Sequence, residues 1–207
     1  SEFLSTNITE ELLIGTAPYI FVRNSPLASI DILGLWSPEG HDALLRHALG
    51  DILRPDFITI AQRGSRTIDE QSSLSPAGAF MHSMKQRTQS VGEALGRRDI
   101  FIKMTLDLAR YDAHHEKCDE ALRLFGVAMH PVMDSASPLH TDAQGNPIIW
   151  PSFPNFTHHS PNDSHGGERT QDITTMIYAT QDKTIRDYYD QVFDDCKCKQ
   201  KIEKQPR

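Results

Sequence analysis

The sequence lacks a hydrophobic run long enough to cross a membrane. A membrane-spanning helix needs roughly 18 or more mostly apolar residues in succession, and no stretch of the 207 residues comes near this. The first residues, SEFLSTNITEELL, also lack the basic start and the apolar core of a signal peptide. We therefore expect neither a transmembrane segment nor a signal peptide in this chain.

Cysteine is also scarce, and acidic residues outnumber basic ones. The three cysteines, Cys118, Cys196 and Cys198, are an odd number, and two of them form a Cys-x-Cys in a lysine-rich stretch. This is not the pattern of a disulfide framework, and we do not expect a structural disulfide. The formal net charge of −7 argues against a surface that holds duplex nucleic acid by its phosphates. A small cleft that binds one phosphate group through metal ions remains compatible with it.

The pattern that is present is mainly helical. Residues 1–35 are rich in β-branched and aromatic residues with Pro and Gly between them, which indicates strands and turns. Beyond this point, helical spacing of apolar residues predicts helices over 37–53, 75–86, 100–113, 117–134 and 170–193. Residues 137–170 are dense in Pro, Gly, Asn, Ser and His and predict a long loop. We therefore predict an all-α, multi-helix domain over 36–207, preceded by a short extended segment over 1–35.

The stretch HPVMDSASPLH gives the first chemical signal. His130 and Asp134 are four residues apart and share a helix face, and His140 follows just beyond Pro138. Neutral imidazoles and carboxylates are the ligands that zinc takes where no thiolate is offered. A single histidine on an apolar face is more often a core residue than a ligand. The stretch alone therefore leaves both interpretations open.

Three further residues favour the metal interpretation. His41 falls on the same helix face as Leu44 and Leu45, His82 lies in the otherwise apolar GAFMHSM, and Asp69 precedes His82 by thirteen residues. Burying imidazoles and carboxylates without partners costs several kcal/mol. A cluster of divalent cations would satisfy all of these groups together.

These residues resemble a known pattern. His-x3-Asp-x5-His, with Pro two residues before the last His, resembles the motif of the zinc-dependent phospholipase C and single-strand nuclease superfamily. The segment WSPEGH, Trp36 to His41, is similar to the N-terminal Trp and nearby His of that superfamily, and Asp69 with His82 matches its next pair. The resemblance covers most of 36–207. It implies an all-α fold that holds up to three zinc ions in a cleft.

The resemblance also implies which residues hold the metals. One ion would be bound by Asp69, His82, His130 and Asp134, and a second would share Asp134 and add His41 with the amine and carbonyl of Trp36. The third would be bound by His140 and a His–carboxylate pair from the long loop. His165 and Glu168 are our choice for that pair, and His159 with Asp163 is the alternative. Asp69 and Asp134 are the expected catalytic carboxylates, with Asp69 as the candidate base.

The front of the chain carries a second resemblance. YIFVRNSPLASIDILGLW resembles the end of the core of RHS-repeat proteins, where NPL..IDPLGL closes a shell and a C-terminal toxin follows, although Ile32 replaces the usual Pro. In that family the shell often cuts itself after the final Leu. The cut would fall between Leu35 and Trp36, so that 1–35 is the end of the core and Trp36 becomes a new N-terminus.

Together the resemblances imply a secreted toxin or effector, delivered into a target cell, that hydrolyses phosphodiester bonds. The leading expectation is a phospholipase C-like enzyme acting on phospholipid at a membrane surface. The alternatives are a zinc-dependent single-strand nuclease, which would bind nucleic acid, and a non-catalytic metal-binding module. The expected partners are the RHS shell of the precursor and a cognate immunity protein.

Overall fold

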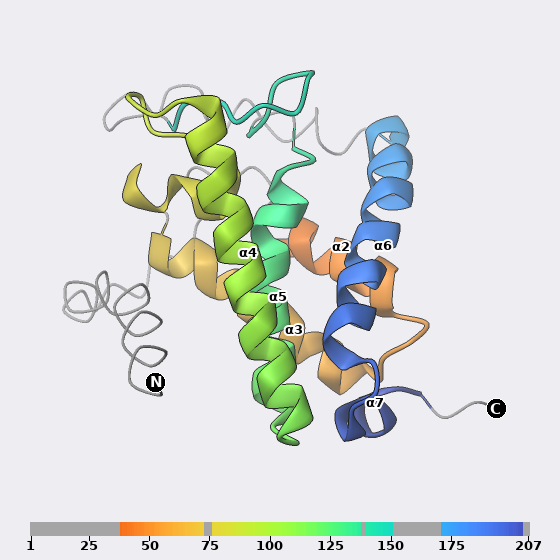
Figure 1. Ribbon diagram of the computed structural model, residues 1–207. Coiled ribbons are helices and arrows are strands. Elements are labelled where there is room, and N and C mark those ends of the chain that lie inside the picture. The colour runs from red at the N-terminus through yellow and green to blue at the C-terminus, as the bar shows by residue number, and fades with distance from the viewer. Residues whose placement is uncertain (1–37, 73–75, 138–139, 151–170, 205–207) are drawn as a thin grey trace, which may run out of the picture. The chain divides into compact units, whose positions relative to one another are not determined.

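The computed structural model describes residues 38–72, 76–137, 140–150 and 171–204, and within these ranges every regular element is a helix and no β-strand occurs (Figure 1). The all-α prediction is therefore confirmed for this part of the chain. The predicted extended segment over 1–35 and the boundary at Leu35 lie outside the described residues. The elements are α2 (Pro38–Leu49), α3 (Pro55–Ser72), the 3-10 helix η2 (Pro76–His82), α4 (Val91–His114), α5 (Cys118–Asp134), α6 (Gln171–Phe193) and α7 (Lys197–Ile202).

Most helices lie where the sequence pattern predicts them. Helices α2, α5 and α6 match the predicted segments, and the segment from Pro76 forms a short 3-10 helix. Helix α4 begins at Val91 rather than at residue 100, because Ser90 caps it: the Glu93 amide donates to Ser90 Oγ over 3.2 Å, and the Ser90 amide donates to Glu93 Oε2 over 2.8 Å. Helix α3, which is polar over much of its length, was not among the predicted helices.

Helix α5 forms the centre of the fold. It packs against α3 and α4 along most of its length, and α2, α6 and α7 complete its surroundings (Figure 1). Phe125 lies in its middle with both Tyr189 and Phe193 of α6 at ring-centroid distances of 6.1 Å. Because these rings are fully buried, they anchor α6 on α5 through apolar burial and edge-on aromatic contact.

Two glycines bring α3 and α5 unusually close together. A Cβ added at Gly126 would lie 1.8 Å from the carbonyl oxygen of Ala61, and one added at Gly64 would lie 2.0 Å from that of Arg123. Ser65, one turn after Ala61, meets His130, one turn after Gly126. Asp69, one turn after Ser65, also lies near His130, at 3.3 Å between Oδ1 and Nε2, so that the later turns of both helices meet at the cluster.

We expect Gly126→Ala to destabilise the protein by about 3 kcal/mol or more, because the added methyl group would collide with backbone that can move only with α3. The measurement is urea unfolding followed by circular dichroism. Gly96→Ala is the matched control: nothing lies within 4 Å of an added Cβ there, and the change should stabilise helix α4 by about 1 kcal/mol. Equal stabilities of Gly126→Ala and the wild type would contradict the close helix approach.

The expectation that no structural disulfide forms is wrong. Cys118 at the start of α5 pairs with Cys198 in α7, with their Cα atoms 5.3 Å apart, and Cys196 remains a buried free thiol. The odd number of cysteines had argued against a disulfide, but only Cys198 of the Cys-x-Cys pairs with Cys118, and Cys196 does not take part. The bond fastens the short C-terminal helix to the core.

The structure describes part of the predicted long loop. Between 140 and 150 the chain turns back on itself, with the Ile148 amide donating to the carbonyl of His140 over 2.9 Å. The end of this turn then lies beside Lys85, whose carbonyl accepts from the Trp150 amide over 2.7 Å. The turn thus fastens the chain after His140 to the segment that follows His82.

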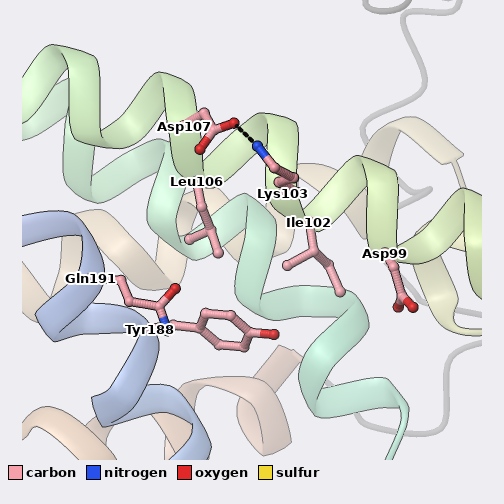
Figure 2. A pocket seen from close by; sticks show the side chains of 7 residues that line it. All are labelled: Asp99, Ile102, Lys103, Leu106, Asp107, Tyr188 and Gln191. Atoms are coloured by element: carbon pink, nitrogen blue, oxygen red, sulfur yellow. Dashed lines mark hydrogen bonds and ion pairs between the residues drawn. The ribbon is translucent and has the colours of Figure 1, made fainter.

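The surface between α4 and α6 holds a groove of about 250 Å³, which the close-up shows from nearby (Figure 2). The Lys103 ammonium and the Asp107 carboxylate form an ion pair at its edge. Its lining residues are Asp99, Ile102, Lys103, Leu106, Asp107, Tyr188 and Gln191, so that no candidate metal ligand contributes to it.

Among the described helices, none combines the length and apolar character that a membrane span requires.

Candidate metal centre

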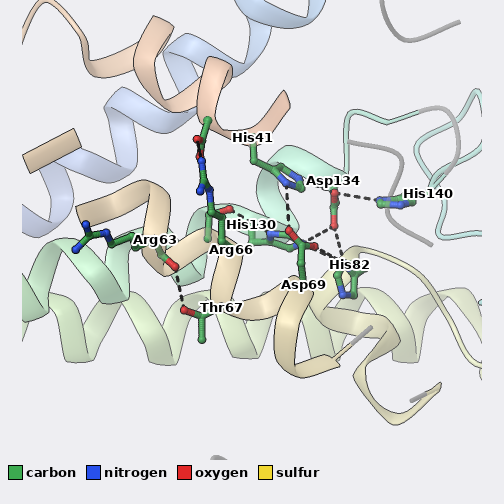
Figure 3. Close-up of polar contacts among 11 residues, drawn as sticks. His41, Arg63, Arg66, Thr67, Asp69, His82, His130, Asp134 and His140 are labelled. Carbon is green, nitrogen blue, oxygen red and sulfur yellow. Dashed lines mark hydrogen bonds and ion pairs between the residues drawn. The ribbon is translucent and has the colours of Figure 1, made fainter. Parts of the chain in front are cut away.

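The fold brings six of the nine predicted ligands into one buried cluster (Figure 3). They come from four helices and the turn after α5, and none is more than 6% exposed. The cluster consists of His41 from α2, Asp69 from α3, His82 at the end of η2, His130 and Asp134 from α5, and His140.

Asp134 lies at the centre of the cluster. Its Oδ1 atom lies 2.9 Å from His41 Nε2 and 3.2 Å from His140 Nδ1. Its Oδ2 atom lies 3.1 Å from both His82 Nδ1 and His130 Nε2. Each oxygen therefore faces its own pair of imidazoles, which is the arrangement that a carboxylate bridging two metal ions needs.

On the Oδ2 side the donor atoms are spaced as a metal requires. His82 Nδ1 and His130 Nε2 are 3.0 Å apart, and each lies 3.1 Å from Asp134 Oδ2. Ligand atoms about 2.0–2.1 Å from a tetrahedral zinc ion are about 3.3 Å from one another. The three separations are therefore within about 0.3 Å of those that zinc needs, and His82, His130 and Asp134 could hold a metal ion. A second set of three that could hold one is His41, Asp69 and His130.

Asp69, from α3, belongs to the second set and also lies beside the first. Its Oδ1 atom is 3.3 Å from His130 Nε2 and 4.0 Å from His82 Nδ1, and its Oδ2 atom is 3.8 Å from His41 Nδ1. The side chain of Asp69 is 6% exposed, whereas that of Asp134 is fully buried. Both carboxylates are therefore enclosed by the protein, because the two oxygens of Asp69 are buried as well.

Burial sets the protonation of His130. Desolvation lowers the pKa of this imidazole from 6.5 to about 3, although the neighbouring Asp134 carboxylate opposes the shift. Burial also acts to raise the pKa of Asp134, but the imidazoles of His140, His130 and His41 outweigh it and hold that pKa well below its usual value. At neutral pH the cluster therefore offers an uncharged imidazole and an ionised carboxylate, the forms that bind metals.

The metal-free protein should lose stability as the pH falls from 6.5 toward 3. Below pH 6.5 the unfolded chain takes up a proton at His130 that the folded protein does not, and below pH 3.8 the same holds for Asp134, so both groups favour unfolding in acid. One such proton corresponds to at most about 1.4 kcal/mol per pH unit. Urea unfolding at several pH values in a chelator measures the slope.

His130→Asn should flatten that slope between pH 6.5 and 4.5. His47→Asn provides the comparison, because His47 is an exposed histidine on α2 whose Nδ1 pairs with Asp182 outside the cluster. If the unfolding free energy of His130→Asn depends on pH in the same way as that of the wild type, the conclusion that buried His130 carries no proton is wrong.

Two contributing residues were not identified from the sequence. Ser65 is fully buried, and its hydroxyl lies 3.1 Å from His130 Nδ1, so that a proton on Nδ1 would leave the lone pair of Nε2 for a metal. Trp150 is 4% exposed, and its ring lies against His82 at a centroid distance of 5.2 Å. Ser65 is one turn before Asp69, a spacing that could have indicated its role; Trp150 carries no comparable signal.

Three predicted ligands belong to segments that the structure does not describe. Trp36, His165 and Glu168 lie beyond the described residues, and so do the alternatives His159 and Asp163. Pro131, which lies between His130 and Asp134, does not interrupt helix α5. The side chains of His130 and Asp134 still meet across one helical turn.

Comparison of the chain with protein-family models, with curated proteins and with solved structures finds no match. The buried set of four imidazoles and two carboxylates is therefore the observation on which a functional assignment has to be based.

Proposed function

We propose that this domain is a zinc-dependent phosphodiesterase, most similar in chemistry to phospholipase C. The observation that carries the proposal is the buried cluster in which Asp134 faces two pairs of imidazoles with its two oxygens. A structural zinc site is usually closed and rich in cysteine. No cysteine belongs to the clustered donor sets, which favours catalysis over a purely structural role.

The residues would divide between metal ions as the resemblance to the phospholipase C and nuclease superfamily implies. His82, His130, Asp134 and Asp69 would hold one ion, and His41 with Asp134 would belong to a second. His140 faces the same Asp134 oxygen as His41, and the remaining proposed ligands are Trp36, His165 and Glu168. Zinc bound in such a site lowers the pKa of a coordinated water toward neutrality and neutralises charge on phosphate oxygens.

Asp69 is our candidate for the general base. Its carboxylate lies 3.3 Å from His130 Nε2 and 3.8 Å from His41 Nδ1, so it would accept a proton from a water molecule bound within the cluster. Asp134 orients the imidazoles of His41, His82, His130 and His140, and Ser65 holds the ring of His130 from behind. The helical walls of α3 and α5 keep bulk water from the centre of the cluster.

Hydrolysis assays on phosphatidylcholine vesicles and on denatured DNA test the function. We expect release of the phosphorylated head group, loss of activity in a chelator and recovery when zinc is returned. Cleavage of DNA alone would identify the nuclease instead. Inactivity on both substrates with a full complement of zinc would favour a metal-binding module and contradict the proposal.

We further propose that the domain is released from the end of an RHS shell by a cut between Leu35 and Trp36, and that it acts as a delivered effector with an immunity partner. A free α-amine has a pKa near 8 and binds zinc once its proton is lost, whereas an amide nitrogen has no available lone pair. The Trp36 amine would thus become a ligand beside His41 only after the cut.

Intact mass, zinc content and phosphodiesterase rate of two forms test this release. The form that begins at Trp36 should bind more zinc and react faster than the uncut chain, and one extra residue before Trp36 should abolish the gain. Equal zinc and equal rates in the uncut and cut forms would rule out activation by cleavage.

A further inference from the structure

The end of η2 contains a backbone conformation that its residue does not favour. Ser83, which directly follows His82, has φ of 54° in the left-handed region. For a residue with a Cβ atom this costs roughly 1–2 kcal/mol, and glycine is the usual residue in such positions. A serine here therefore needs a reason.

The hydrogen bonds show why a left-handed residue is required. The Met84 amide donates to the carbonyl of Ala79 over 2.9 Å, and the Ser83 amide donates to the carbonyl of Phe80 over 3.3 Å. This pair of bonds is the Schellman motif that closes a helix, with the left-handed residue just after the last helical one. His82 is that last residue, so the position of its imidazole depends on this closure.

The serine side chain supplies what glycine could not. Ser83 is fully buried, and its hydroxyl donates to the carbonyl oxygen of Pro131 over 2.5 Å. Pro131 lies in α5 between the two ligands His130 and Asp134. The hydroxyl therefore joins the end of η2 directly to the helix turn that carries those two ligands.

We infer that Ser83 is a positioning residue that fixes the imidazole of His82 against His130 and Asp134. The strain at Ser83 is offset by a buried hydrogen bond, and the bond sets the 3.0 and 3.1 Å separations between His82 Nδ1 and its two neighbours. The ring of Trp150 supports His82 from another direction. This inference rests on the proposed function where it concerns metal binding.

Two substitutions of Ser83 separate positioning from general stability. Ser83→Ala removes the hydroxyl and keeps the strained Cβ, whereas Ser83→Gly removes the hydroxyl and also relieves the strain. Ser135→Ala is the control, because the Ser135 hydroxyl, at the C-terminal cap of α5, donates back to the carbonyl of Val132 in the same helix. Zinc affinity by chelator competition and the visible spectrum of the cobalt-loaded protein are measured on the full chain.

We expect both Ser83 variants to bind zinc about 10–100-fold more weakly and to shift the cobalt spectrum, while Ser135→Ala stays like the wild type. Ser83→Gly should be the more stable of the two without recovering affinity. An effect through stability alone would instead restore affinity in Ser83→Gly and leave the cobalt spectrum unchanged. Wild-type affinity and spectrum in Ser83→Ala would also overturn the inference.

If the wild type binds neither zinc nor cobalt, the proposed function is wrong. The positioning role of Ser83 is then tested on the metal-free protein. The imidazole resonances of His82 at a fixed pH should then move in Ser83→Ala and in Ser83→Gly but not in Ser135→Ala. Unchanged His82 resonances in both Ser83 variants would overturn the positioning role independently of any metal.

Discussion

Replacing Asp134 with asparagine is expected to abolish phosphodiesterase activity and to weaken zinc binding by at least about 100-fold. Removing a residue that only supports a metal ligand weakens binding by about 10–100-fold, and the loss of a ligand itself should cost at least as much. The side chain keeps its size, but one of the two oxygens becomes an amide group. Each oxygen of Asp134 now faces two imidazoles, so the substitution removes one metal's ligand whichever way the amide turns. Zinc content by mass spectrometry and the rate on phosphatidylcholine are the two measurements.

Asp107→Asn is the control for charge and composition. Asp107 is an exposed residue of α4 that pairs with Lys103 one turn away, and its substitution should change neither zinc content nor rate. Full zinc and full activity in Asp134→Asn would mean that the carboxylate is only a structural partner of its four histidines.

Removing the disulfide between Cys118 and Cys198 should cost about 4 kcal/mol of folding stability. The bond closes a segment with a sequence separation of 80 residues, and chain-entropy estimates for such loops give about that value. Urea unfolding with and without a reductant, and of Cys198→Ala, measures the effect. Alkylation of the denatured chain should find one thiol without a reductant and three with it, because only Cys196 is free.

The same experiment should leave the metal centre intact. Cys118 and Asp134 are the first and last residues of α5, which places the two sites about 24 Å apart at 1.5 Å per residue. Zinc affinity of the folded, reduced protein is therefore expected to match that of the oxidised one. Cys196→Ala controls for loss of a buried thiol. Three reactive thiols before reduction, or unchanged stability afterwards, would contradict the disulfide.

The sequence predicted those parts of the fold that a regular pattern determines. Helices α2, α5 and α6 follow from apolar spacing, and the buried face of α2 carries His41 beside Leu44 and Leu45 as expected. Helix α3 was missed because its buried face mixes apolar residues, such as Phe57 and Ala61, with the polar Ser65 and Asp69. The pairing of Cys118 with Cys198 depends on where α7 docks, which no local spacing encodes.

In the candidate site, too, the ligands could be predicted from the sequence, whereas the residues that support them could not. Six residues that the fold gathers from distant positions were identified from the motif around His130, from the spacing of Asp69 and His82, and from His41 in WSPEGH. Their supporting residues were not predictable in this way. Ser83 is recognisable only through its positive φ and its bond to Pro131, and Trp150 reaches His82 only because the turn after His140 folds back.

Anomalous diffraction at the zinc absorption edge, from crystals of residues 36–207 grown with zinc, tests the metal centre most directly. We predict an anomalous peak about 2.0–2.2 Å from His82 Nδ1, His130 Nε2 and Asp134 Oδ2, and a second on the Oδ1 side of Asp134 next to His41. Zinc-soaked crystals with an intact cluster and no peak within it would contradict the account.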